Sequence, residues 1–210
     1  MRFSLLCLLS AFVFIHCSST GKKTVVTENT NPSIPPNGNI SISWNPNVIT
    51  QDFIIESLSV FQNVNIGIKP LSDSRTNKET IGTIILNGQT TTAIPKTDIV
   101  NWCSKNLVRG FQFLGLKSAA RNQSFSFEGE VTSFSVQQDI TMRGEISMSL
   151  SCIKDDLTVW EGTIEGHSEL YVIPKGSDGV SECMSNTLIN AIYNLLNDKS
   201  FVDAVKKSRH

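Results

Sequence analysis

The sequence lacks the features by which common enzymes and nucleic-acid-binding proteins are recognised. Its 210 residues carry 18 lysines and arginines against 19 acidic side chains. Because nucleic-acid-binding domains concentrate positive charge, this balance excludes a nucleic-acid partner. Neither a phosphate-cradling glycine loop nor a dinucleotide fingerprint occurs in the chain. Of the three histidines, His16 falls in the predicted leader and His210 is the terminal residue, which leaves only His167 in the body of the predicted domain. We therefore expect no enzymatic activity, no catalytic residues, no metal and no bound cofactor.

Cysteine is also scarce. The five cysteines are Cys7, Cys17, Cys103, Cys152 and Cys183. Cys7 falls in a predicted export leader and Cys17 in a predicted lipid-attachment site, so the other three allow at most one disulfide. An exported protein can form such a bridge but does not require one. All three fall on apolar faces of predicted elements, which favours small buried side chains and leaves their pairing open.

The amino terminus has the organisation of an export signal. Arg2 precedes an almost unbroken apolar run over residues 5–15, which is too short to span a bilayer that needs roughly 20 residues. The run ends at His16 and Cys17, followed by small polar residues. This pattern resembles a bacterial lipoprotein signal. The resemblance implies a signal peptide over residues 1–16, with a diacylglycerol and an acyl chain such as palmitate on Cys17.

His16 occupies a position where that pattern prefers a small residue, and Phe14 replaces the usual leucine. The alternative is ordinary secretory cleavage a few residues later, within residues 18–20. If Cys17 is lipidated, two or three acyl chains form an effectively permanent anchor, because a single chain binds a membrane only marginally.

A polar segment separates this signal from the domain. Residues 17–50 are rich in serine, threonine, asparagine and proline, and we assign them to a tether, with residues 18–38 as its flexible part. About 20 flexible residues have a root-mean-square span of about 25 Å. The single folded domain is expected over residues 51–210.

Within the domain, alternation of apolar and polar residues predicts several long strands. They are expected at residues 60–68, 79–86, 125–136, 140–152 and 159–170. Asn87 and Gly88 predict a tight turn after the second strand. A phase slip between Val131 and Phe134 predicts a β-bulge.

Helical periodicity predicts three helices, near residues 97–115, 177–195 and 200–205. Thr97 is expected to cap the first, and Gly115 to end it. Ser177 or Asp178 is expected to cap the second. Ser200 and Asp203 suggest a capping box for the third. The order β-β-α-β-β-β-α-α predicts an α+β fold, with an antiparallel sheet of about five strands and helices on one face.

Residues 64–75 run from a hydrophobic strand into an Asp73-Ser-Arg75 signature, with Ile81-Gly82 shortly after. The segments at Gly110-Phe111 and at residues 197–201 are similar too. Over residues 58–207 the chain resembles the YajG-type bacterial lipoprotein family. The resemblance implies a small α+β lipoprotein facing the periplasm, accessory more than catalytic.

Asp73 and Arg75 are the weak binding candidates of the domain. On an extended chain their side chains share a side, so an ion pair can fasten the loop after the first strand. An exposed pair contributes about 0–1 kcal/mol. Loop fastening is the favoured interpretation, and a ligand or partner contact is the alternative.

Two weaker patterns suggest a metal site and a catalytic nucleophile. Glu165, His167 and Glu169 share one strand face, but they spread over about 13 Å, too far for one metal ion. Ser168 follows Gly166-His, yet it lies within a strand and lacks the second glycine of a nucleophile motif. A solvated sheet face explains both patterns better.

The sequence therefore predicts a membrane-anchored envelope lipoprotein with a non-catalytic binding or structural role. We expect an outer-membrane location and, as partner, an envelope protein or peptidoglycan. The alternative is an accessory lipoprotein of an envelope transport system that binds lipid or a transporter subunit.

Overall fold

The computed structural model describes residues 38–48, 53–118, 123–171 and 176–209. The predicted signal peptide over residues 1–16, Cys17, and the predicted tether as far as residue 37 lie outside the described residues. None of the helices in the described ranges is long and apolar enough to cross a membrane.

Across those ranges the fold is a mixed α+β arrangement of nine strands, three α-helices and one short 3-10 helix. The strands are β1 (Asn39–Ile40), β2 (Asn65–Ile68), β3 (Ser72–Asp73), β4 (Gly82–Leu86), β5 (Gln89–Pro95), β6 (Lys117–Ser118), β7 (Phe125–Gln138), β8 (Met142–Lys154) and β9 (Leu157–Leu170). The helices are η2 (Leu58–Phe61), α1 (Ile99–Phe113), α2 (Ser177–Asn197) and α3 (Lys199–Ser208).

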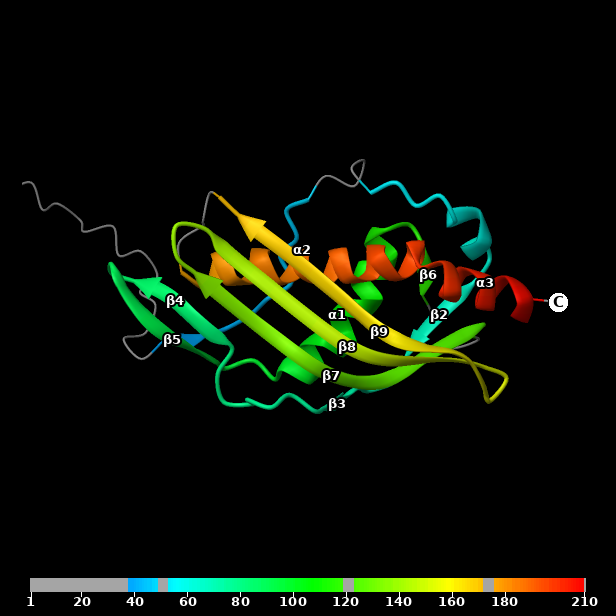
Figure 1. Cartoon of the computed structure of the whole chain (residues 1–210), viewed down its shortest axis with the longest axis horizontal. Coiled ribbons are helices and arrows are strands. Elements are labelled where there is room, and N and C mark those ends of the chain that lie inside the picture. The colour runs from blue at the N-terminus through cyan, green and yellow to red at the C-terminus, as the bar shows by residue number, and fades with distance from the viewer. Residues whose placement is uncertain (1–37, 49–52, 119–122, 172–175, 210) are drawn as a thin grey trace, which may run out of the picture. The chain divides into compact units, whose positions relative to one another are not determined.

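Strand β7 organises the sheet (Figure 1). One of its edges pairs antiparallel with β8, which pairs antiparallel with β9. Its other edge is occupied in turn by β2, β3 and β4, all parallel to β7. β4 forms an antiparallel hairpin with β5, while β1 and β6 add parallel pairs at β5 and β2.

The expected sheet of about five antiparallel strands is therefore corrected. The antiparallel pairs involve most of the paired residues, but five short pairings are parallel. β1, β3 and β6 have two residues each, too few to show alternation in a sequence. The predicted bulge is confirmed, because the β7–β8 register shifts between Val131 and Ser133.

The α-helices cover one face of the sheet, and α2 lies across β8 and β9 (Figure 1). Two glycines allow this close approach. A Cβ atom added at Gly166 would overlap the Thr187 carbonyl oxygen, and one at Gly144 would overlap the Thr187 hydroxyl. Leu188 and Ile192 of α2 are also fully buried. The interior between α2 and the sheet is thus filled by side chains.

The predicted helix ends are partly wrong. Asp98, not Thr97, caps α1 by accepting a hydrogen bond from the Asn101 amide at 3.0 Å. Gly115 follows α1 with a φ of 87°, as predicted.

The amino-terminal caps of α2 and α3 also differ from the predicted ones. The residue before α2 is Gly176, which has no side chain to cap with, in place of Ser177 or Asp178. Asp198 caps α3 through the Phe201 amide at 2.8 Å, and Ser200 instead donates to Asp198. At α1 and α3, the carboxylate of the aspartate just before the helix accepts the capping hydrogen bond, in place of the hydroxyls that the sequence pattern favoured.

Residues 41–47, here called the strap, run along α2. Ile42 and the neighbouring Ile40 are buried in the core. Alternate strap amides donate to α2 side chains: Ser43 to Ser181 Oγ at 3.1 Å, Asn45 to Ser185 Oγ at 2.9 Å, and Asn47 to Asn186 Oδ1 at 2.9 Å. From Ser43 to Asn45 the extended chain advances about 6.6 Å, and from Ser181 to Ser185 the helix advances about 6 Å, so the first two contacts are in step.

The position of the strap corrects two predicted boundaries, the tether over residues 17–50 and the start of the domain at residue 51. Residues 38–48 belong to the folded domain, because Ile40 and Ile42 need burial and the strap amides find partners on α2. Thr97, the expected helix cap, accepts the Ile42 amide at 2.8 Å and holds the start of the strap.

Candidate functional site

Asp73 and Arg75, the binding candidates of the sequence, form the predicted ion pair. Asp73 ends β3, which lies along the edge of β7. Arg75 Nη2 lies 2.9 Å from Asp73 Oδ2 and Arg75 Nε lies 3.0 Å from Oδ1, so the contact is bidentate. The Arg75 amide also donates to Oδ1 at 3.1 Å. The Arg75 hydrogen bonds hold the pKa of Asp73 below its ordinary value.

This pair is more buried than the sequence suggested. The Arg75 side chain is only 6% exposed and the Asp73 side chain 23%. Arg75 Nη1 is buried without a hydrogen-bond partner among the described residues. A buried guanidinium with one unpaired nitrogen depends strongly on the carboxylate that it keeps. Removal of Asp73 alone should therefore destabilise the fold more than the loss of an exposed pair would, because it leaves a buried charge uncompensated.

An open depression of about 410 Å³ borders the ion pair. It is lined by Asp73, Arg75, Lys78, Pro95, Thr97, Asp98, Ile99 and Val100. Lys78 Nζ donates to the Asp73 carbonyl at 2.8 Å, and the Asp98 carboxylate caps α1. Two acidic and two basic side chains meet here with most of their bonds internal, so the depression offers no net charge to an ionic ligand.

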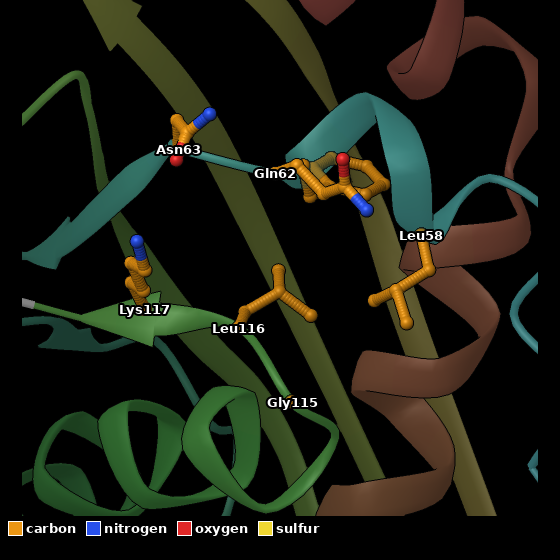
Figure 2. Close-up of a pocket in the computed structure, with 7 residues that line it drawn as sticks. Leu58, Gln62, Asn63, Gly115, Leu116 and Lys117 are labelled. Carbon is orange, nitrogen blue, oxygen red and sulfur yellow. The ribbon is translucent and has the colours of Figure 1, made fainter.

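A second hollow lies beside η2, where the sequence predicted no site (Figure 2). It has a volume of about 290 Å³ and is lined by Leu58, Phe61, Gln62, Asn63, Gly115, Leu116 and Lys117. In Figure 2, Leu58 and Gln62 border one side, and Leu116 and Lys117 the other. Its walls join two segments some 55 residues apart, which no local pattern reveals. Two of the lining residues have left-handed backbone, Asn63 with a φ of 65° and Gly115 with a φ of 87°.

The third open depression is basic and lies near the carboxyl end. Ser59, Val60, Lys206 and Arg209 line it. Arg209 Nη1 donates to the Val60 carbonyl at 2.7 Å, which ties the terminal basic residues to the domain.

The acidic residues of β9 do not assemble into a metal site. His167 Nδ1 lies 4.0 Å from Glu145 Oε1 on the adjacent strand, and both side chains are well exposed. Glu169 instead accepts the Thr141 hydroxyl at 2.7 Å, and this bond lowers its pKa. In the described ranges no three histidine, cysteine or acidic side chains could jointly hold a metal ion.

Ser168 and the domain cysteines make packing and hydrogen-bond contacts within the domain. The Ser168 hydroxyl donates to the Cys183 carbonyl at 2.8 Å and lies 2.7 Å from the Thr187 hydroxyl, so it joins β9 to α2. Cys103, Cys152 and Cys183 are buried and unpaired. Burial raises the pKa of the Cys152 thiol to about 12 and also raises the pKa values of Cys103 and Cys183. Buried thiols of this kind are poor nucleophiles.

Comparison with known proteins adds information on the fold. No family model matches the chain, and no curated protein matches it. A crystal structure of a Xanthomonas campestris protein of the DUF330 family is 12% identical, covering 82% of this chain and 99% of that one, with a TM-score of 0.51. At this identity the likeness shows a shared fold alone.

More distant likenesses include two further bacterial structures. A hypothetical protein from Chlamydia trachomatis is 7% identical, covering 67% of this chain and 98% of that one, with a TM-score of 0.42. A lipoprotein from Neisseria meningitidis is 8% identical, covering 62% of this chain and 96% of that one, with a TM-score of 0.31. Neither similarity is strong enough to support a functional argument.

Proposed function

We propose that this protein is an envelope lipoprotein, held on a bacterial membrane through lipid on Cys17, whose domain binds or braces a partner without catalysis. The observation that carries the proposal is the apolar run over residues 5–15, which is followed by His16 and Cys17 and then by small polar residues. The partner class in this proposal is an envelope protein or peptidoglycan. The resemblance to the YajG-type family and the small Ser18 after Cys17 support an outer-membrane location.

The surroundings of the reactive side chains support a non-catalytic role. Ser168 is engaged with α2, and the three described thiols are buried. The Arg75 guanidinium is occupied by Asp73. The uncovered face of β7, β8 and β9 remains as a broad polar surface on which a partner can bind, with exposed glutamates such as Glu145 and Glu165.

The second candidate function is an accessory lipoprotein of an envelope transport system. A lipid held between the helix layer and the sheet is disfavoured, because Gly144 and Gly166 bring α2 into direct contact with the sheet. The hollow between Leu58 and Leu116 favours a different version, in which an apolar group of a lipid or transporter subunit binds beside η2.

Metabolic labelling with palmitate tests the anchor. We expect label on the wild-type chain and none on Cys17→Ala, which should also keep its leader. Cys7→Ala is the matched control, because it removes a leader cysteine outside the cleavage site and should label normally. Equal labelling of Cys17→Ala and wild type would overturn the proposal.

A further inference from the structure

The register of the sheet gathers several chain reversals at one end, here called the entry end. Gln138 pairs with Met142 and Met142 with Leu170, so the β7–β8 turn lies beside the end of β9. β4 runs parallel to β7 at Val136 and Gln137, which brings the β4–β5 turn to the same end. In Figure 1 these turns lie together at the left, far from α3 and the carboxyl terminus.

The preceding chain joins the domain at this end. The Gly38 carbonyl accepts the Ile94 amide at 2.9 Å, and Asn39 pairs with Ile94. β1 lies beside the part of β5 that pairs with Gly82 of β4, and Gly82 pairs with Val136 near the end of β7, so Gly38 lies at the entry end. The entry end is therefore the part of the sheet connected most directly to Cys17.

The length of chain between Cys17 and Gly38 limits how far this end can stand from the anchor. Twenty residues, 18–37, separate the two positions. Fully extended, they reach at most about 70 Å. The opposite end of the sheet is separated from the entry end by the length of β7, which is about 45 Å for its 14 residues.

The entry end also displays the two most exposed large apolar side chains among the described residues. Ile140 is 92% exposed and Tyr171 is 77% exposed. Asp139 holds the turn that presents Ile140, because its carboxylate accepts the Thr141 amide at 3.0 Å and pairs with Arg143. The Tyr171 hydroxyl donates to Glu169 at 3.1 Å and leaves the ring outward.

The chemistry of these two side chains fits a lipid surface. Tyrosine suits the membrane–water boundary, where its ring meets apolar groups and its hydroxyl stays hydrated. Isoleucine at the tip of a polar turn has no packing role within the domain, since turns ordinarily carry polar residues or glycine. Two such side chains bind a bilayer weakly alone, but a tether supplies an effective concentration of about millimolar.

We propose that the entry end lies on the membrane that holds the anchor, with Ile140 and Tyr171 in its interfacial layer. The inference rests on the proposed lipid at Cys17. It orients the domain: the hollow beside η2 and the basic residues Lys206 and Arg209 then face away from the membrane, toward a partner.

A fluorescent label on a single added cysteine tests this orientation. Ile140→Cys places the label at the entry end. Leu157→Cys is the matched control, because Leu157 is also apolar and 70% exposed but lies at the β8–β9 turn, at the opposite end. The buried Cys103, Cys152 and Cys183 should stay unlabelled, as the chain without an added cysteine will show.

The full lipidated chain is labelled with an environment-sensitive nitrobenzoxadiazole dye and incorporated into vesicles of phosphatidylethanolamine and phosphatidylglycerol. We expect at least a twofold rise in emission at position 140, with a blue shift and quenching by doxyl-labelled lipid, and no change at position 157. A chain that floats with the vesicles while both labels stay in water overturns the orientation alone. A chain that does not float overturns the lipid anchor and the orientation with it.

Discussion

Helices α1 and α2 cover the same sheet in different ways. α1 has one buried side, with Leu107 and Phe111 fully buried, and an exposed side that includes Lys105 and Arg109. In α2 every residue from 179 to 189 is buried, the polar ones included. The sheet covers one side of α2 through glycine contacts, and the strap covers the other through hydrogen bonds.

This difference shows how the domain incorporates its amino-terminal segment. A buried hydroxyl or amide needs a partner, and the strap amides satisfy Ser181, Ser185 and Asn186. The strap in turn positions Gly38 beside β5, so the polar side of α2 determines where the preceding chain enters. α1 receives one contact of this kind, from the Leu71 amide to the Ser104 hydroxyl at 3.1 Å, and otherwise depends mainly on apolar packing, with the Asp73–Arg75 pair close to its amino end.

The largest expected effect comes from Gly166→Val, which removes the close contact of α2. A valine side chain would overlap the Thr187 carbonyl and the Ala191 backbone, both of which are held in the helix. We expect a loss of about 4 kcal/mol or more in the free energy of unfolding, measured by urea denaturation with circular dichroism.

Gly88→Asn is the control for this substitution. An added Cβ at Gly88 meets nothing within 4 Å, and asparagine tolerates the positive φ of 78°. Its stability should stay within about 0.5 kcal/mol of wild type. If Gly166→Val is equally mild, α2 does not depend on direct contact with the sheet.

A smaller effect is expected from Leu107→Ala, the corresponding test of α1. Leu107 is fully buried, so truncation should cost about 3 kcal/mol through lost contacts and the remaining cavity. Val108→Ala, at a partly exposed position on the same helix, should cost less than half as much. Equal losses in urea denaturation would mean that α1 is not one-sided in its packing.

Asp73→Asn tests the polar neighbour of α1 through the pH dependence of stability. Arg75 lowers the pKa of Asp73 below 3.8, so the charged pair stabilises the fold above that pH, and the contribution is lost as pH falls through the folded-state pKa. We expect a loss of about 2 kcal/mol at pH 7, because a charge-assisted hydrogen bond to a buried group is weakened.

The loss caused by Asp73→Asn should shrink when urea denaturation is repeated at pH 3 and below. Glu79→Gln, at an exposed position nearby, controls for the loss of one negative charge. A difference between Asp73→Asn and wild type that stays constant from pH 7 to pH 2.5 would contradict a role for the ion pair.

The long elements of this fold could be predicted from the sequence because their periodicity is local. Helical periodicity predicted α1, α2 and α3, and alternation predicted β7, β8 and β9. The parallel strands β1, β3 and β6 could not be predicted, since two-residue pairings depend on the edge of β7 or its neighbours and not on their own sequence.

The surfaces of the domain were harder to predict than its core. The Asp73–Arg75 pair follows from spacing along one extended segment, and it was predicted correctly. Its burial was not, because the packing of α1 determines it. The hollow beside η2 joins Leu58 and Leu116, which no local pattern connects.

The strap shows the same limit. Residues 40–44 alternate between apolar and polar, yet proline and asparagine nearby suggested a tether. Its partner on α2 lies about 140 residues later in the chain. Neither segment alone indicates the other.

The smallest effect is expected from Ser185→Ala, which tests whether the polar side of α2 holds the strap. Its hydroxyl accepts the Asn45 amide at 2.9 Å, and its removal leaves that amide without its partner. We expect a loss of about 1 kcal/mol in the free energy of unfolding, together with faster amide hydrogen exchange at Asn45. Asn101→Ala, at an exposed position on α1, should change neither quantity beyond about 0.5 kcal/mol. If exchange at Asn45 stays slow in Ser185→Ala, apolar packing of Ile40 and Ile42 holds the strap without help from α2. The polar side of α2 would then be a consequence of burial and not the feature that positions the entering chain.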